Sequence, residues 1–327
     1  MGFQAYMKEK LDAYDKKILF ELDINSRLSA SKIAKKLKLP KETVNYRIKR
    51  LEKNGWINRL YTIFNASLFG YSYYRVFLKF YKLTASTKME IIDYITSDPT
   101  CANLRVLEGQ YDVVFLTIQK NPGELKGFLQ CFLNNFGMYV LEKNVFILMK
   151  THKLNQKFLS EGRTIKKTFT HINVKDFPLD KIDLGIMKLI STNARIKLSA
   201  IAQSLKVDSR LIEYHIKRME RLGIIVAYTT DLNLVRINRE LIQIDIALKD
   251  PAIIPDIINF FDKTNTSIFV HEMLGKYDLS VEIYVENHEM LRDILENFTE
   301  QYLENYVYYD VSHVYKEYVI NWSPFHV

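Results

Sequence analysis

The chain contains the same series of residues twice, at a fixed distance of 168 positions. Matching pairs run from Leu11 and Leu179 to Gly55 and Gly223 without a gap. A second segment, Gly109-Gln110-Tyr111-Asp112, recurs as Gly275-Lys276-Tyr277-Asp278 at an offset of 166. Periods of about 20 to 50 residues indicate solenoids and arrays of small repeats. This much longer period instead predicts a duplicated unit of two domains.

Composition agrees with a globular chain of several domains. The 327 residues are 48% hydrophobic, which is enough for several small cores. Lys and Arg exceed Asp and Glu by 46 to 38, a mild excess that fits either an anionic partner or a solvated surface. The two cysteines have no metal or redox spacing, and no apolar run approaches the roughly 18 residues of a membrane span. We expect a cytoplasmic protein with no cofactor, no metal and no membrane partner.

The first repeated module has apolar residues at helical spacing in three successive stretches. A glycine and an alternating strand-like stretch follow the third, which predicts a winged helix-turn-helix, with helix, helix, turn, helix and strand pair. The second copy preserves every stretch. Asp208 is expected to cap its third helix, whereas the first copy has Pro40 at that point. The stretches are Ile18, Leu19 and Leu22; Ile33, Ala34 and Leu37; Val44, Ile48 and Leu51; and Ile186, Met187 and Ile190; Ile201, Ala202 and Leu205; Ile212, Ile216 and Met219.

The third helix of each module is the candidate DNA-reading element. In a helix-turn-helix this helix enters the major groove, and its outer face contacts phosphates and base edges. The alternative is an ordinary solvated helix, but the position of these residues in two helix-turn-helix patterns favours DNA. The candidate DNA-binding residues are Lys41, Thr43, Asn45, Tyr46, Arg47, Lys49 and Arg50 in the first copy and Arg210, Glu213, Tyr214, His215, Lys217 and Arg218 in the second.

A second module follows each winged helix. Alternating and helical patterns predict the order βαββαβ over residues 72–150 and again over residues 241–319. This order is typical of a ferredoxin-like split βαβ fold, which leaves one face of its sheet bare. The expected fold class is α+β, with two winged helix-turn-helix domains alternating with two ferredoxin-like domains. We expect the two sheets to pack face to face, because each offers the obvious cover for the other.

These motifs in this order resemble the Lrp/AsnC family of archaeal and bacterial feast/famine regulators. The resemblance extends over nearly the whole chain and implies two fused subunits of the family. It implies a sequence-specific transcriptional regulator that binds double-stranded DNA and pairs its regulatory domains within one chain, with homo-oligomers of such chains expected. The motifs are Asp15-Lys16-Lys17-Ile18-Leu19, Ser26-Arg27-Leu28-Ser29, Ile33-Ala34-Lys35-Lys36-Leu37, Tyr46-Arg47-Ile48-Lys49-Arg50-Leu51-Glu52, Gly55-Trp56-Ile57 and the Gly-x-Tyr-Asp segment.

The expected division of the chain follows from the two modules and their repeat. The ranges are 1–66 for the first winged helix, 67–152 for the first ferredoxin-like domain, 153–177 for a linker, 178–235 for the second winged helix and 236–327 for the second ferredoxin-like domain. The linker is polar and basic, which suits either a solvated tether or contacts with the DNA backbone. Since the outward residues of the third helices differ between copies, we expect a DNA site that is not a true palindrome.

The Gly-x-Tyr-Asp segments have a structural and a functional interpretation. Glycine permits a positive φ in a hairpin, tyrosine fills the sheet and aspartate ends it. The family resemblance implies that an amino acid or another small effector binds near this turn. The candidate effector-binding residues are Gly109, Tyr111, Asp112, Gly275, Tyr277 and Asp278.

Catalytic motifs are scarce, and we expect no enzyme. His271-Glu272 and His288-Glu289 lack the second histidine of a zinc-protease motif, and no phosphate-binding glycine loop is present. One enzyme alternative remains, because the sirohaem decarboxylases resemble the same architecture, with His271 as a candidate tetrapyrrole contact. A protein-interaction module is a third alternative, since a winged helix does not by itself fix function.

Overall fold

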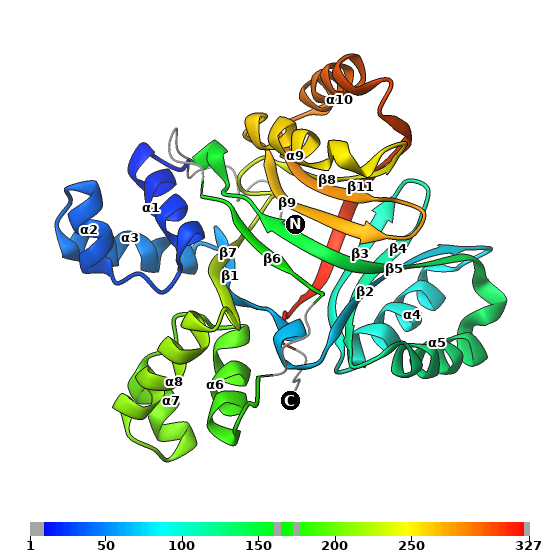
Figure 1. Cartoon of the computed structure of the whole chain (residues 1–327). Helices are drawn as coiled ribbons and strands as arrows, with labels where there is room; N and C mark the ends of the chain where they lie inside the picture. The colour runs from blue at the N-terminus through cyan, green and yellow to red at the C-terminus, as the bar shows by residue number, and fades with distance from the viewer. Residues whose placement is uncertain (1–9, 160–164, 173–176, 324–327) are drawn as a thin grey trace.

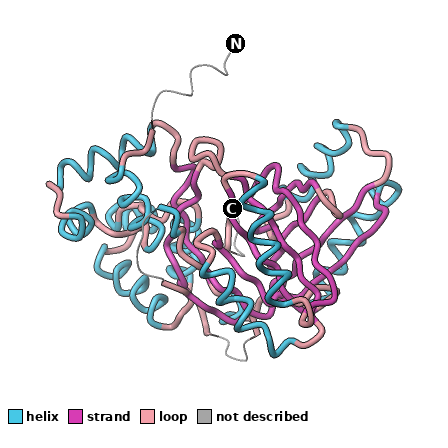
Figure 2. The backbone as a smooth tube through the Cα atoms, turned by 90° about the horizontal axis from the view of Figure 1, so that it is seen from above, coloured by secondary structure: helices cyan, strands magenta, loops and turns pink. Residues whose placement is uncertain are grey.

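The computed structural model describes residues 10–159, 165–172 and 177–323. Two winged-helix modules lie on one side of the molecule, and a large sheet with four outer helices forms the rest (Figure 1). Seen from above, the strands gather at the centre with helices around them (Figure 2). The predicted α+β class, with winged helices alternating with βαββαβ modules, is confirmed.

Each winged-helix module contains three helices and one strand. Asp12 and Asp180 begin the first helix of their modules, each in a capping box with the aspartate three residues later. As predicted, Asp208 caps α8, whereas α3 begins after Pro40 without a side-chain cap. The elements are α1 (Ala13–Ile24), α2 (Ala30–Leu37), α3 (Lys41–Lys53) and β1 (Ile57–Phe64), then α6 (Lys181–Ser191), α7 (Leu198–Leu205), α8 (Ser209–Arg221) and β7 (Ile225–Leu232).

The wing strands pair between modules, and the prediction of a strand pair within each module was wrong. Strand β1 pairs antiparallel with β7, so that Leu60 lies opposite Thr230. Arg27 donates to the carbonyl of Ala194 at 2.6 Å, and Arg195, its counterpart in the repeat, donates to the carbonyl of Ser26 at 2.6 Å. These reciprocal bonds join the two modules into one unit, which fixes α3 relative to α8.

The second modules follow the predicted order βαββαβ in both halves. Their helices pack on the outer face of their own sheets over separate apolar cores, one around Phe115 and Phe132 and the other around Phe261 and Phe298. The elements are β2 (Ser72–Phe80), α4 (Ala85–Ser97), β3 (Cys101–Glu108), β4 (Val113–Gln119), α5 (Pro122–Phe136) and β5 (Val140–Lys153), then β8 (Glu240–Leu248), α9 (Ile254–Lys263), β9 (Ser267–Leu274), β10 (Leu279–Val285), α10 (His288–Tyr302) and β11 (Tyr306–Ile320).

The two four-stranded sheets join at both edges into one closed ring of strands. Strand β3 pairs with β11, and β5 pairs with β9, so the order runs β2-β4-β3-β11-β8-β10-β9-β5 and returns to β2. The prediction that the inner faces cover one another is confirmed, since Arg75 of β2 bonds Glu282 of β10 across the interior. The sequence did not predict the edge pairing, which makes the halves continuous rather than merely stacked.

Part of the predicted linker 153–177 belongs to the fold instead of forming a free tether. Strand β6 (Lys167–Thr170) pairs with β5, and Leu154, Leu159 and Phe169 are buried. Lys153 bonds the carboxylate of Asp23 in α1 at 3.1 Å. The residues 160–164 and 173–176 lie outside the described part. The division of the chain into five ranges stays a prediction.

Substituting the two glycines Gly275 and Gly127 by alanine should have opposite effects on stability. Gly275 has a φ of 155°, and a Cβ there would lie 2.5 Å from Phe146. Gly275→Ala should therefore lower the free energy of unfolding by about 1–3 kcal/mol. Gly127 lies within α5 with nothing near its missing Cβ, so Gly127→Ala should raise that free energy by up to about 1 kcal/mol. Urea unfolding midpoints measure both effects. A similar shift in both variants would contradict the conclusion that Gly275 is required by its backbone and its contact with Phe146, and that Gly127 is not.

Candidate nucleic-acid interface

The exposed faces of α3 and α8 carry eight of the thirteen predicted DNA-binding side chains. Tyr46 and Tyr214, which are equivalent in the repeat, are 65% and 58% exposed. Such exposure of a tyrosine leaves it available for contact with a partner. The exposed candidates are Lys41, Asn45, Tyr46 and Lys49 on α3, and Arg210, Glu213, Tyr214 and Lys217 on α8. Thr43 is half-buried.

Arg47 and Arg50 turn back toward α1 and bind its aspartates. Arg47 contacts Asp12 at 2.6 Å and Asp15 at 2.8 Å, while Arg50 binds the other oxygen of Asp15. Asp15 is buried, so these arginines neutralise a carboxylate inside the module. The hydrogen bond to Asp12 also raises the pKa of Arg47 above its ordinary value. The prediction that Arg47 and Arg50 lie on the outer face was wrong, because α1 supplies a charge that the helix pattern alone did not reveal.

In the second module, basic side chains of the third helix likewise turn inward and bind a buried aspartate of the first helix. His215 is buried and its Nδ1 lies 2.8 Å from Asp183, while Arg218 contacts the other oxygen of Asp183 at 3.1 Å. The prediction that His215 and Arg218 face outward was therefore also wrong. Both modules use the third helix to neutralise a buried aspartate of the first helix. The Asp15–Asp183 repeat match was the sequence signal for this pairing.

Asp180, at the start of α6, joins Asp183 and His215 in a group whose ligand atoms are close enough together for a metal ion. The carboxylates of Asp180 and Asp183 and a ring nitrogen of His215 lie within 4.8 Å of one another. In the first module the equivalent residues are Asp12, Asp15 and Arg47, and arginine is not a metal ligand. Asp180 caps α6, and Asp183 is paired with Arg218. Capping and ion pairing therefore account for the cluster.

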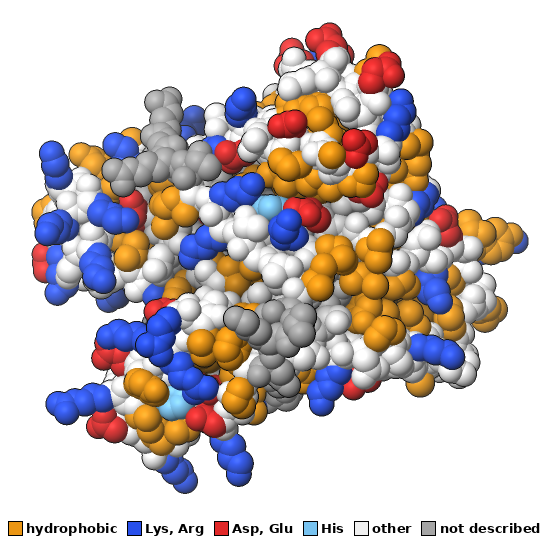
Figure 3. Space-filling view, viewed as in Figure 1, with side chains coloured by type: hydrophobic (Ala, Val, Ile, Leu, Met, Phe, Trp, Pro, Cys, Tyr) orange, Lys and Arg blue, Asp and Glu red, His pale blue; other side chains and the backbone are white. Residues whose placement is uncertain are grey.

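Basic side chains gather over the two winged-helix modules (Figure 3). On α2 the exposed lysines Lys32, Lys35 and Lys36 add to those of α3. In a helix-turn-helix the helix before the recognition helix crosses the DNA backbone. The arrangement therefore offers phosphate-binding charge beside the candidate base-reading face of the first module.

The two Gly-x-Tyr-Asp turns approach one another, with Gly109, Gly275 and Lys276 exposed. Lys276 lies over the rings of both Tyr111 and Tyr277, and both tyrosines are buried. Tyr277 binds Asp310, whereas Tyr111 binds Glu142, so each tyrosine fills the sheet as the structural interpretation predicts.

The aspartates and glycines of these turns also have structural roles. Asp112 and Asp278 accept from the backbone N–H groups of Phe80 and Leu248, respectively. The expected positive φ is found at Gly275 and not at Gly109. Gly109 is instead required because a Cβ would lie 2.6 Å from the hydroxyl oxygen of Ser312.

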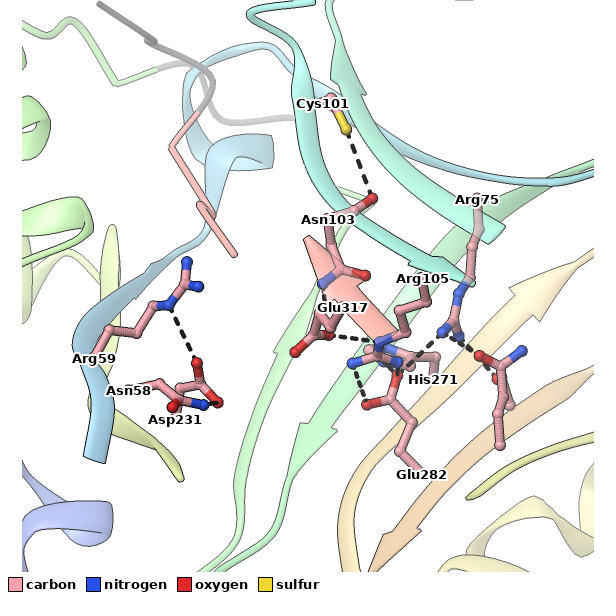
Figure 4. Close-up of polar contacts among 12 residues, drawn as sticks. Asn58, Arg59, Arg75, Cys101, Asn103, Arg105, Asp231, His271, Glu282 and Glu317 are labelled. Carbon is pink, nitrogen blue, oxygen red and sulfur yellow. Dashed lines mark hydrogen bonds and ion pairs between the residues drawn. The ribbon is translucent and has the colours of Figure 1, made fainter. Parts of the chain in front are cut away.

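A charged cluster inside the ring was missed by the sequence analysis. Arg75 and Arg105 of the first half converge on Glu282 of the second (Figure 4). Burial opposes ionisation of Glu282, but the neighbouring Arg105 and His271 hold the pKa of its carboxyl well below the usual value. The signal was present, since Arg75, Arg105 and Glu282 each lie between apolar neighbours in a strand.

The residues of this cluster differ between the two copies. Arg75 binds Gln243, the residue that occupies its own position in the second copy, at 2.9 Å. At the offset of 166, Arg105 corresponds to His271 and Leu116 to Glu282. A symmetric pair of first halves would place Arg75 against Arg75 with no glutamate between them. The ring interior is therefore specific to the pairing of these two different halves.

His271 has a structural role in the cluster. Burial lowers the pKa of its imidazole to about 4, so the ring is neutral near pH 7. Its Nδ1 lies 2.9 Å from the hydroxyl of Thr151, and its Nε2 lies 3.2 Å from Glu282. In the neutral ring Nε2–H donates to the carboxylate, and Nδ1 accepts from the hydroxyl.

A small cavity adjoins this cluster where the ring meets the wing strands. Its volume is about 50 Å³, and Tyr61, Arg105, Asp231 and Trp322 are among its lining residues. Pockets for small-molecule ligands are usually on the order of 300–1,000 Å³. Burial, with the charge of Glu317, raises the pKa of Asp231 to about 7. The cavity is too small for a tetrapyrrole beside His271.

Comparison with known proteins links both halves to DNA-binding proteins. The family model described as "Winged helix-turn-helix DNA-binding" matches residues 11–58 and 179–226. An uncharacterized HTH-type transcriptional regulator of Pyrococcus abyssi is 30% identical over 124 residues, which cover 36% of this chain and 80% of that protein. The HTH-type transcriptional regulator FL11 of Pyrococcus horikoshii is 29% identical over 147 residues, which cover 45% of this chain and 95% of the relative.

A solved structure shares the whole duplicated architecture. The siroheme decarboxylase NirDL superimposes with a TM-score of 0.65 over 95% of both chains, at 11% sequence identity. At that identity the likeness shows a common fold and no common activity.

Among the residues that the structure describes, none of the helices is both long and apolar enough to cross a membrane.

Proposed function

The chain belongs to the Lrp/AsnC family of winged helix-turn-helix regulators and is a tandem duplication of the family's unit. We propose that this DNA-binding transcriptional regulator reads one duplex site with both α3 and α8. Cytoplasmic localisation is part of the proposal. The candidate DNA-contacting residues are the eight exposed ones, with Arg47, Arg50, His215 and Arg218 reassigned to positioning the helices.

The observation that carries the proposal is the fixed pairing of two exposed, basic helix-turn-helix faces. The β1–β7 pairing and the reciprocal Arg27 and Arg195 bonds hold the modules together. A regulator that contacts two successive half-sites needs a constant separation between its recognition helices. Within one chain the family's dimeric arrangement is thus covalent, so it does not depend on protein concentration.

Removing the outward charge of both recognition helices should abolish most DNA binding. The quadruple variant replaces Lys49, Lys53, Lys217 and Arg221 by alanine; all four side chains are exposed. If every one of the four contacts a phosphate, the slope of log affinity against log salt falls by about 3.6. This value is the upper limit of the expected fall, with affinity at physiological salt lowered by up to about a thousandfold. Salt-dependent electrophoretic retardation of duplex DNA measures both quantities.

The matched control also removes four exposed basic residues, but from the ferredoxin-like modules. These are Lys126, Lys143, Lys249 and Lys263. The control has the same net charge change as the quadruple variant, so it corrects for long-range electrostatics. We expect its DNA affinity to stay close to that of the native chain. Equal losses in both variants, with unfolding midpoints unchanged, would reject α3 and α8 as the DNA-binding face.

We further propose that a small effector, such as an amino acid, acts near the paired Gly-x-Tyr-Asp turns. Support comes from their convergence: Lys276 of one turn lies 3.5 Å from the hydroxyl of Tyr111 in the other. An ammonium group among three aromatic rings, with Asp310 nearby, is suited to a polar ligand. We also propose that several copies of this chain associate into a homo-oligomer.

A further inference from the structure

The two winged helices carry different amounts of phosphate-binding charge at equivalent positions. Residues 29–53 contain nine basic and two acidic residues, whereas the equivalent residues 197–221 contain six basic and three acidic residues. The net charges are therefore +7 and +3 with histidine neutral. Without Arg47, Arg50 and Arg218, which pair with the buried Asp15 and Asp183, they are +5 and +2. Because the two segments have the same fold, this difference concerns equivalent surfaces.

The difference is largest on the helix that precedes each recognition helix. Lys32 and Lys35 are exposed on α2, and their counterparts on α7 are the equally exposed Ala200 and Gln203. The described helix α7 contains no basic residue. Since this helix crosses the DNA backbone in a helix-turn-helix, the first module has backbone-binding charge that the second lacks.

The recognition helices show the same difference, since α3 offers more positive charge that is free to bind phosphate than α8 does. On α8, Lys217 forms an ion pair with Glu213 at 2.6 Å, and this hydrogen bond lowers the pKa of Glu213, which favours its ionised form. The equivalent residues on α3 are Lys49 and the uncharged Asn45. A phosphate must therefore compete with Glu213 for Lys217, whereas Asn45 gives no such competition to Lys49.

We infer that the first winged helix provides most of the phosphate binding and that the second binds its half-site more weakly, so that one chain lies on DNA in a single orientation. The inference rests on the proposed function. A homodimer cannot make this distinction, because its two modules are identical. The difference between the two copies makes one half-site dominant, and the chain can therefore mark a direction along the DNA.

The experiment divides the quadruple variant into its two equivalent halves. The first variant combines Lys49→Ala with Lys53→Ala, and the second combines Lys217→Ala with Arg221→Ala. A third variant, called the α2 exchange, gives α2 the residues found at two equivalent positions of α7, by Lys32→Ala with Lys35→Gln. Each replaces exposed residues, so unfolding midpoints should not change. The probe is a short duplex of random sequence, since phosphate binding is independent of sequence.

We expect the two first-module variants each to lower the salt slope by roughly 2 and affinity at physiological salt by roughly thirtyfold. The second-module variant should lower the slope by less than half as much. Equal slope losses for the two equivalent pairs, or an unchanged slope for the α2 exchange, would overturn the inference and leave the proposed function intact. Absence of salt-sensitive binding by the native chain would overturn the proposed function itself.

Discussion

Residues 1–155 expressed alone are expected to self-associate or aggregate instead of forming a soluble monomer. The half would lose the partners of β1, β3 and β5 and would expose three unpaired strand edges. It would also expose the inner face around Phe77, which packs on Tyr111 and Phe146. Unpaired edges and large apolar patches both promote association.

Association of two such halves should not restore the native ring. The ring interior would then hold Arg75 and Arg105 twice and Glu282 not at all, so four buried guanidinium groups would lack the carboxylate that pairs with them. Burying unpaired charge is costly. Size-exclusion chromatography and light scattering measure the outcome, and co-expression with residues 156–327 should restore a soluble complex. A monodisperse monomer with cooperative unfolding would refute the closed-ring pairing.

Glu282→Gln is expected to lower the free energy of unfolding by about 3–5 kcal/mol near neutral pH, because it leaves two buried arginines without their shared carboxylate. Arg75 and Arg105 contact Glu282 at 3.1 and 2.6 Å. Glu296 provides the control, since its pair with Arg292 within α10 is exposed. Surface pairs contribute little, so Glu296→Gln should barely change the urea midpoint. Equal effects of the two substitutions would contradict a structural role for the cluster.

The effect of Glu282→Gln should also depend on pH. The folded pKa of Glu282 is depressed, so its ionisation stabilises the fold above the unfolded pKa of about 4.3. This contribution is lost as the pH falls through the folded pKa. The difference between native and variant chains should therefore be complete near pH 7 and diminish below about pH 4. Urea unfolding at a series of pH values measures it.

Local patterns were sufficient to predict the modules. The three apolar stretches from Ile18 to Leu51 fix the helices of the first winged helix, because burial of one helical face requires this spacing. Cap residues such as Asp208 act over only a few positions, so the sequence reveals them directly. The duplication made each assignment testable against a second copy, and the order βαββαβ followed from the same local periodicity.

Side-chain direction on the recognition helices was decided by contacts between elements. Arg47 and His215 are polar, and helical spacing alone placed them with the outward residues. The buried carboxylates of Asp15 and Asp183 draw them inward, because an unpaired charge in the module core would cost more than withdrawing a basic side chain from solvent. No pattern within α3 or α8 contains this information.

The sequence by itself determined that the chain holds two copies of a helix-turn-helix and a βαββαβ module, since hydrophobic periodicity and caps are short-range properties. Only the tertiary structure decided that the wing strands pair between modules, that the sheets close into a ring, and that Arg75 meets Glu282 inside it. These pairings join residues that are far apart in the chain, where the backbone hydrogen bonds of one strand edge are compatible with several partners. The choice among those partners depends on packing and charge across the whole interface.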